Sequence, residues 1–142
     1  MTAVATEPRS CLADYNPETG HYTIWAGSGG AVRQKAELAQ ACGIDPAKLR
    51  VLSLDVGGNF GSRNRPYVEF GMVLWAAGKL KRPVKFTATR TESLLSDYQG
   101  RDLYSRVSLA LSRDGKFLGL RADNISNVGA LCSSLSPLGK GS

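Results

Sequence analysis

The sequence predicts an α+β fold, a mixed sheet with two main helices and a C-terminal β-hairpin, and three observations lead to it. Short segments that alternate like strands are interspersed with two longer stretches of helical periodicity. Two glycine-rich breaks, Gly27–Gly30 and Gly57–Arg63, each lie between a strand-like and a helix-like segment. An alternating pattern interrupted by an Asp-Gly pair follows near the C-terminus. Because no repeat or linker interrupts the sequence, we interpret residues 1–142 as a single domain.

The first two strands are expected at residues 12–15 and 21–26. Residues 16–20 between them, Asn-Pro-Glu-Thr-Gly, carry proline and glycine in the positions of a hairpin turn. After the first glycine-rich break, apolar residues recur near one face over residues 31–41 and predict a helix. Gly43 stands where a left-handed residue commonly ends such a helix.

The middle of the chain predicts a strand, a helix and a second strand. Asp45 and Pro46 are suited to the N-cap and first turn of a short helical segment. Residues 51–56 read as a buried strand that leads into the second glycine-rich break. Residues 67–79 predict the second main helix, and its apolar residues occupy so many faces that we expect it to be largely buried. A proline ends this helix, and residues 84–88 then alternate like a half-buried strand.

The last third of the chain predicts a short helix and the hairpin. Thr89 and Glu92 have the spacing of a capping box, ahead of a helix that continues to residue 95. Leucine and valine alternate with polar residues over residues 103–111. The Asp-Gly pair at 114–115 is typical of a tight turn, and residues 117–125 form the returning strand.

The chain is basic, with 18 Lys and Arg against 12 Asp and Glu, and this charge is unevenly distributed. Residues 46–90 hold nine basic and two acidic residues, a net charge of +7 that exceeds the +6 of the whole chain. Such a concentration indicates either a solvated basic face or a surface for an anionic partner. With 42% hydrophobic and 21% charged residues, the composition is that of a globular protein.

Several chemistries are excluded by what the sequence lacks. Its three cysteines, Cys11, Cys42 and Cys132, are far apart and form no CxxC pair, which excludes a disulfide framework and a four-cysteine metal site. His21 is the only histidine, so we expect no metal-ligand set in this chain. No apolar run reaches membrane length, and the first residues lack the pattern of a secretory signal. We therefore expect no membrane span and a reducing, cytoplasmic location.

The two glycine-rich breaks are the main candidate for a functional site. Glycine lets a ligand approach the main chain closely, and a helix that follows adds unpaired N–H groups and a positive dipole. A phosphate or another oxyanion is favoured there, and Arg63 and Arg65 would add charge-assisted contacts. Phe60 is unusual, because a large ring in a loop is costly unless it packs on a core or shapes a pocket. Neither break has the pattern of a P-loop or a dinucleotide-binding turn.

A nucleic-acid-binding module is a competing interpretation, because Gly58–Gly61 has the GxxG form of a KH loop in a basic neighbourhood. A KH loop joins two helices, however, whereas a strand is expected to precede this one. The aromatic content of 8% is also low for a surface on which bases stack. We therefore expect no nucleic-acid partner.

At the second break the sequence resembles the large subunits of molybdenum hydroxylases. Residues 51–69, VLSLDVGGNFGSRNRPYVE, are similar to the family signature V-x-x-x-D-V-G-G-G-F-G-x-K-x-x-x-Y-x-E. This family includes xanthine dehydrogenases, aldehyde oxidoreductases and aerobic carbon monoxide dehydrogenases. Shorter matches follow in the family's order, so that the resemblance covers residues 7 to 132; they lie at residues 7–9, 13–15, 81–85, 89–92, 100–101, 114–116 and 127–130.

The resemblance implies a molybdopterin cofactor, in its cytosine dinucleotide form. The implied reaction is hydroxylation of a C–H bond, or oxidation of carbon monoxide, with oxygen taken from water. Electrons would leave through iron–sulfur and flavin subunits. The implied cofactor-binding residues are Ser28, Gly29, Gly57, Gly58, Asn59, Phe60 and Gly61, and the implied substrate-side residues are Arg63 and Asn64.

The chain departs from the family pattern within both breaks. Asn59 stands in place of the third glycine, and Arg63 in place of the usual lysine. Asn64 occupies the position where xanthine-oxidising members carry a substrate-contacting glutamate, so purine specificity is not implied. In the first break the usual Thr-Gln pair is Ser28-Gly29, which removes a side-chain amide expected to contact the cofactor.

The resemblance also implies that this chain is a fragment of a larger subunit. In the family's order the catalytic glutamate lies beyond Ser142, so we assign no catalytic residue and expect the chain alone to be inactive. The remainder of the large subunit would then be a partner. Alternatively, the chain is a stand-alone, non-catalytic association domain on the same scaffold, whose uncovered apolar surfaces favour self-association.

Overall fold

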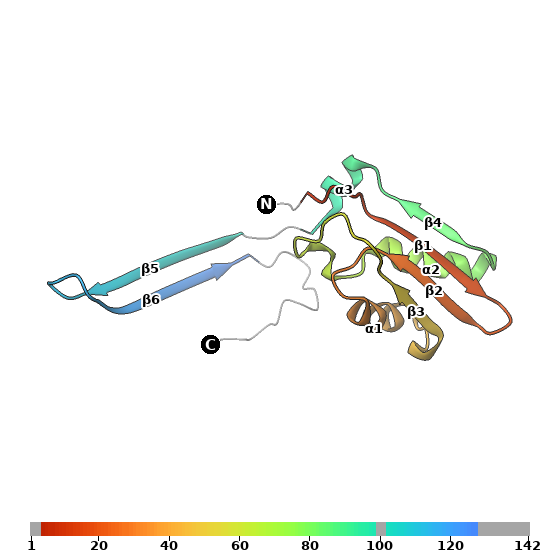
Figure 1. Cartoon of the computed structure of the whole chain (residues 1–142), viewed down its shortest axis with the longest axis horizontal. Coiled ribbons are helices and arrows are strands. Elements are labelled where there is room, and N and C mark those ends of the chain that lie inside the picture. Colours follow the sequence, from red (N-terminus) through yellow and green to blue (C-terminus); the bar gives the residue numbers. More distant parts are fainter. Residues whose placement is uncertain (1–3, 99–101, 128–142) are drawn as a thin grey trace. The chain divides into compact units, whose positions relative to one another are not determined.

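The computed structural model describes residues 4–98 and 102–127, which fall into two compact units. One unit lies within residues 2–99 and the other within residues 100–142. Among the described residues, the larger unit holds a four-stranded sheet with three α-helices, and the smaller one holds an antiparallel hairpin (Figure 1). The predicted α+β class is therefore confirmed, with its mixed sheet and C-terminal hairpin. The interpretation of residues 1–142 as a single domain stays a prediction.

The sheet is built around β1 (Ser10–Asn16), and its strand order is β3-β2-β1-β4. Strands β2 (His21–Ala26) and β4 (Val84–Thr87) both run antiparallel to β1. Strand β3 (Leu49–Leu52) pairs in parallel with β2, and this makes the sheet mixed. Strand β3 begins and ends earlier than the predicted residues 51–56, and its last ladder pair joins Leu52 to Trp25, one residue before β2 ends.

Helices α1 (Ala31–Cys42) and α2 (Val68–Leu80) pack on each other and cover one face of the sheet (Figure 1). Gly43 ends α1 with a φ of +64°, as its position in the sequence predicts. The core between helices and sheet is one cluster of buried side chains, and its most enclosed large members are Ile24, Leu38, Phe70 and Leu74. Strand β2 ends directly before the first glycine-rich break, whereas residues 53–56 separate the end of β3 from the second.

Helix α2 is buried on one side only, which corrects the expectation of a largely buried helix. Leu74 and Ala77 are fully buried, but Val68, Met72 and Trp75 are 79%, 62% and 65% exposed. These three recur at intervals of three and four residues, so they form a stripe along the outer side of the helix. The apolar residues on several faces of α2 thus reflect a surface that no described residue covers.

Two further local predictions are confirmed. Helix α3 (Arg90–Ser96) begins at a capping box, in which the Glu92 amide donates to Thr89 Oγ1 (3.2 Å) and the Thr89 amide to the Glu92 carboxylate (2.7 Å). The short 3₁₀ turn η1 (Pro46–Lys48) is capped by Asp45, which accepts from the Ala47 amide at 2.8 Å. Both caps satisfy amide groups that a helix start leaves unpaired.

The smaller unit is the hairpin of β5 (Leu103–Leu111) and β6 (Phe117–Ser126). Val107 faces Ala122 and Leu109 faces Leu120, so one side of the hairpin is apolar. The other side is mixed: it carries charged groups such as Arg106 and Asp123 beside the Tyr104–Ile125 pair. The unit exposes both sides, and two-stranded hairpins are at best marginally stable in water, so its apolar side is suited to burial against another surface.

Cys11, in the central strand β1, provides a test of this core. Burial, with the nearby charge of Glu69, raises the pKa of its thiol from an ordinary 9.0 to about 12. The folded chain thus holds the proton that the unfolded chain releases above pH 9, so stability falls as the pH rises from 9 towards 12. We expect Cys11 to contribute a slope of up to about 1.4 kcal/mol per pH unit in this window. Urea unfolding of the wild type and of Cys11→Ala, each at pH 8, 9.5 and 10.5, measures that slope, and parallel pH profiles would contradict the expectation.

Candidate cofactor-binding loops

The first break, Gly27–Gly30, connects the end of β2 to the start of α1, where the sequence places it. Ser28 is buried and holds the turn together: its hydroxyl accepts from the Gly30 amide at 3.0 Å. Its main chain is bound to Ser53, whose hydroxyl accepts from the Ser28 amide and donates to the Ser28 carbonyl, both at 3.1 Å. Helix α1 has no side-chain cap and no acidic residue in its first turn, so its first amide groups remain available as donors.

The second break, Gly57–Arg63, packs against the N-terminal segment of the chain. The Gly57 amide donates to the Glu7 carboxylate at 2.8 Å, and the Glu7 amide donates to the Gly57 carbonyl at 3.2 Å. A Cβ on Gly57 would stand 2.4 Å from Glu7 Cβ, and one on Gly58 would stand 3.1 Å from Ala5 Cβ. Gly58 also has a φ of +117°. Both glycines are therefore required by the chain's own packing.

The rest of the second break is a tight turn around Asn59. The Asn59 side-chain oxygen accepts from the Gly61 amide, and its carbonyl accepts from the Ser62 amide, each at 3.1 Å. Phe60 and Gly61 both have positive φ, +50° and +87°. This geometry turns the Phe60 ring outward, where it is 71% exposed. A short 3₁₀ turn, η2 (Ser62–Asn64), follows before α2 begins.

The two breaks are in direct contact. The Gly29 amide donates to the Arg63 carbonyl at 3.1 Å. The amide nitrogen of Asn59 donates to the side-chain oxygen of Asn64 at 2.9 Å, and this amide pair lies directly against Gly29. The structure thus brings together the implied cofactor-binding residues of both breaks and Asn64 in one surface region. Whether they contact a cofactor stays a prediction.

The Arg63 side chain is buried in the interior of the larger unit. It is 5% exposed and forms an ion pair with Glu7 at 2.8 Å. The same guanidinium also donates to the Glu7 carbonyl. Glu7 therefore neutralises Arg63 and at the same time anchors Gly57. In the sequence, Glu7 stands out only as part of a short match. Its pairing with Arg63 leaves no local signal, because the two residues are 56 positions apart.

Arg9, in the same N-terminal segment as Glu7, contacts helices α2 and α3. Arg9 is 2% exposed, pairs with Glu69 of α2 at 3.1 Å, and stacks 4.5 Å from the centre of the Tyr67 ring. It also donates to the Ser93 carbonyl at 3.3 Å and to the Ser96 hydroxyl at 2.5 Å, both in α3. Burial and a hydrogen bond to Asp97 raise the pKa of Tyr67, so this ring stays neutral beside the arginine.

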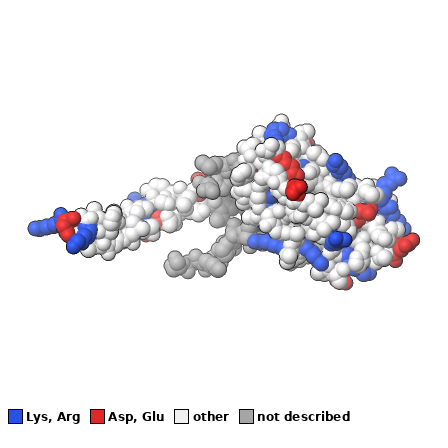
Figure 2. Space-filling model, in the orientation of Figure 1, with Lys and Arg blue, Asp and Glu red and all other residues white. Residues whose placement is uncertain are grey.

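On the face that Figure 2 shows, Lys and Arg lie in separate groups with acidic residues between them and do not form one patch. Arg63 and Arg65 are 4% and 9% exposed. Arg90 donates to the carbonyls of Ala5 and Thr6, at 2.7 and 2.5 Å. Arg63 and Arg90, two of the basic residues of the segment 46–90, thus hold the second break and the N-terminal segment in place.

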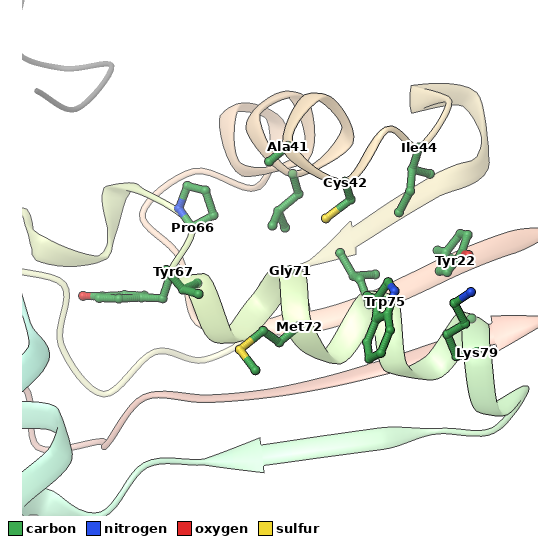
Figure 3. Close-up of a pocket in the computed structure, with 14 residues that line it drawn as sticks. Tyr22, Ala41, Cys42, Ile44, Pro66, Tyr67, Gly71, Met72, Trp75 and Lys79 are labelled. Atoms are coloured by element: carbon green, nitrogen blue, oxygen red, sulfur yellow. The ribbon is translucent and has the colours of Figure 1, made fainter. Parts of the chain in front are cut away.

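A large groove of the larger unit lies elsewhere, between α1 and α2. It has a volume of about 830 Å³, and neither glycine-rich break contributes to its lining. Figure 3 shows Met72 and Trp75 of α2 beside it, with Cys42 and Ile44 on the opposite side. Its lining is mostly apolar and has no cluster of acidic, histidine or cysteine ligands. The groove is suited to packing rather than to acid–base chemistry. Within residues 4–98 and 102–127, no helix is long and apolar enough to cross a membrane.

The fold and the paired breaks can be compared with known proteins. Residues 1–139 match the family model of the molybdopterin cofactor-binding domain. The chain belongs to this family. The resemblance to molybdenum hydroxylase large subunits is thereby confirmed, and molybdopterin is the cofactor of the family. Its cytosine dinucleotide form stays a prediction.

Individual relatives of this molybdopterin-binding domain agree with the family match. The chain is 30% identical over 131 residues to the carbon monoxide dehydrogenase large chain of Hydrogenophaga pseudoflava, covering 92% of this chain and 16% of the relative. It is 29% identical over 124 residues to the xanthine dehydrogenase of Emericella nidulans, covering 87% of this chain and 9% of the relative. The crystal structure of quinoline 2-oxidoreductase from Pseudomonas putida 86 superposes with a TM-score of 0.80 at 27% identity, over 87% of this chain and 16% of that one. The chain thus spans only a small part of the length of its relatives.

The residues of the two breaks fit a phosphate-bearing, anionic cofactor. No atom lies within 4 Å of the place where a Cβ would stand on Gly30 or Gly61, so these glycines leave their main chain open on that side. The start of α1 contributes unpaired amide groups without a competing acid. The carboxylate of Glu7, which packs against the second break, is bound to Gly57 and Arg63. The region therefore offers main-chain donors, and the negative charge of Glu7 beside them is compensated.

Proposed function

We propose that this chain supplies the glycine-rich cofactor loops of a molybdopterin-dependent oxidoreductase large subunit. The proposed reaction is hydroxylation of a C–H bond, or oxidation of carbon monoxide, with oxygen from water. The observation that carries the proposal is the direct contact between the two breaks, each of which presents main-chain or amide donors. The family match provides the cofactor class.

In this proposal the chain binds and orients the cofactor and does not carry out the chemistry alone. When bound, molybdopterin would hold the molybdenum at which the substrate is oxidised. The residues proposed to contact it are Ser28, Gly29, Gly57, Gly58, Asn59, Phe60 and Gly61, with Arg63 and Asn64 nearer the substrate. Because Arg63 is buried against Glu7, its proposed contribution is to hold Gly57 and Asn64 in position.

The proposed partners are the remainder of the large subunit and the iron–sulfur and flavin subunits. Two relatives are named as parts of larger enzymes: the carbon monoxide dehydrogenase large chain and the subunit gamma of a 6-hydroxypseudooxynicotine dehydrogenase complex. Three features of this chain suit a covering partner: the groove between α1 and α2, the exposed stripe on α2 and the apolar side of the hairpin.

The proposal is tested by the pterin that the full-length polypeptide carries when it is purified from a host that makes molybdopterin. We expect about one pterin per chain, measured as its fluorescent oxidation product, and one CMP per chain after hydrolysis if the cofactor is the cytosine dinucleotide. Phe60→Ala is expected to reduce the retained pterin several-fold and to change stability by less than about 0.5 kcal/mol, because the ring is exposed.

Phe117→Ala, which removes a ring that is 78% exposed in the hairpin, is the matched control and should retain the wild-type pterin content. A wild-type protein without pterin would contradict the proposal. The isolated 142-residue chain is expected to show no dehydrogenase turnover, and stoichiometric molybdenum with activity from that chain alone would contradict the assignment of catalysis to other parts of the subunit.

Self-association is the second candidate, and the same exposed apolar surfaces favour it. Val68, Met72 and Trp75 extend along the groove or beside it, and an uncovered stripe of this kind promotes contact between copies. Sedimentation of the 142-residue chain separates the two candidates: a concentration-dependent dimer supports self-association, and a clean monomer that retains its fold argues against it.

A further inference from the structure

Gly29 and Gly30 are adjacent and neither has a positive φ, yet an added Cβ would collide with other atoms at only one of them. A Cβ on Gly29 would stand 1.9 Å from the amide nitrogen of Asn59 and 2.0 Å from the side-chain oxygen of Asn64. A Cβ on Gly30 would meet no atom within 4 Å. The absence of a side chain at position 29 is therefore a consequence of the Asn59–Asn64 amide pair, which fills that place.

The amide pair is fixed on both sides. Asn59 donates to Asn64 at 2.9 Å, and its side-chain oxygen accepts from the Gly61 amide at 3.1 Å. The Gly29 amide itself donates to the Arg63 carbonyl at 3.1 Å. A side chain at position 29 and the Asn59 amide in its present position therefore cannot occupy the same place.

The same pair retains donors that the described residues do not use. One N–H of Asn59 is taken by Asn64, which leaves its second N–H and both N–H groups of Asn64 without a partner among residues 4–98 and 102–127. Both side chains are partly exposed, at the contact of the two breaks. They are neutral donors, which suit an anionic group without adding a charge of their own.

The two departures from the family pattern that concern amides, Gly29 and Asn59, fall on this one contact. We propose that the Asn59–Asn64 pair is a recognition element which replaces a side-chain amide at position 29 and binds an anionic group of the pterin cofactor. This inference rests on the proposed function, since it names which side chains of this chain act towards the cofactor. The two positions form one unit, so each determines what the other can be.

The steric exclusion between position 29 and the Asn59 amide is tested by the thermal stability of the protein, without any cofactor assay. In the full-length polypeptide, Gly29→Ala is expected to lower the melting temperature by roughly 3 °C or more, because the amide pair must move. Gly30→Ala, the matched control, should lower it by less than Gly29→Ala does, because its Cβ meets no atom and only the poorer capping of α1 by alanine remains. Gly29→Gln should be similarly destabilised, and adding Asn59→Gly to it should recover most of the loss. Additive effects of Gly29→Gln and Asn59→Gly would overturn the exclusion.

The proposed recognition of the cofactor by Asn59 and Asn64 is tested by the amount of pterin that the protein retains. Asn59→Asp keeps the shape and the acceptor for Gly61 but replaces the donor with a carboxylate, and we expect roughly a tenfold loss of pterin retained after dialysis. Asn59→Gly should also lose pterin, and Gly29→Gln/Asn59→Gly should regain it. A wild-type protein that carries pterin while Asn59→Asp keeps it fully would overturn this inference alone. A wild-type protein without pterin would contradict the proposed function as well.

Discussion

Replacing Glu7 by alanine is expected to destabilise the larger unit by about 3 kcal/mol, because it leaves the Arg63 guanidinium buried without its counter-charge. Arg63 is 5% exposed and cannot regain water where it lies. The same substitution removes the acceptor of the Gly57 amide. We therefore expect the second break to detach from the N-terminal segment and the full-length polypeptide to lose most of its pterin. Urea unfolding and pterin content measure the two effects.

The matched comparison is Arg63→Met, alone and combined with Glu7→Ala. Methionine fills part of the buried volume without a charge, so Arg63→Met should cost less, about 2 kcal/mol. The double variant has no unpaired charge and should be at least about 1 kcal/mol more stable than the sum of the single effects predicts. Strict additivity would show that the pair contributes through packing and not through its charges.

The second large effect is expected from Arg9→Ala, which should destabilise the larger unit by about 3–5 kcal/mol. Arg9 is 2% exposed and contacts α2 through Glu69 and Tyr67, and α3 through the Ser93 carbonyl. Its loss leaves the Glu69 carboxylate without its ion pair and removes the Arg9 contacts that join α2 to α3. Thermal unfolding followed by far-UV circular dichroism measures the loss.

Arg50→Ala is the matched control, since Arg50 lies in β3 of the same sheet with an exposed side chain. It should change stability by less than about 0.5 kcal/mol. Arg9→Lys keeps the charge but not the planar group that bonds in several directions at once, so it should recover only part of the stability. Equal stability of Arg9→Lys and the wild type would show that charge alone matters here.

Local signals in the sequence predicted most of the fold. The turn before β2, the left-handed Gly43, the Asp45 cap and the Thr89–Glu92 capping box all lie where the residue types indicate. Each of these depends on neighbours within a few residues, so the chemistry that fixes it is written in one short segment. The exposed side of α2 was predicted wrongly, because periodicity cannot distinguish a buried face from an apolar face that the described residues leave uncovered.

The candidate site was predicted in its components but not in its assembly. The sequence indicates two glycine-rich breaks and a resemblance that connects them to molybdopterin. It does not indicate that Gly57 and Gly58 are glycines because residues 5–7 pack against them. Nor does it indicate that Arg63, an expected ligand contact, is enclosed by Glu7.

By itself, the sequence determined the order of the elements, the α+β class and the family to which this chain belongs. Only the tertiary structure decided what each residue of the breaks does, because those roles depend on contacts between residues far apart in the chain. Glu7 meets Arg63 across 56 positions, and Gly29 meets Asn59 across 30. The residue type alone does not show whether a ligand, a carboxylate or an amide lies against a glycine. In the folded chain, a Cβ at position 29 would overlap the Asn59–Asn64 pair, and a Cβ at position 30 would meet no atom within 4 Å.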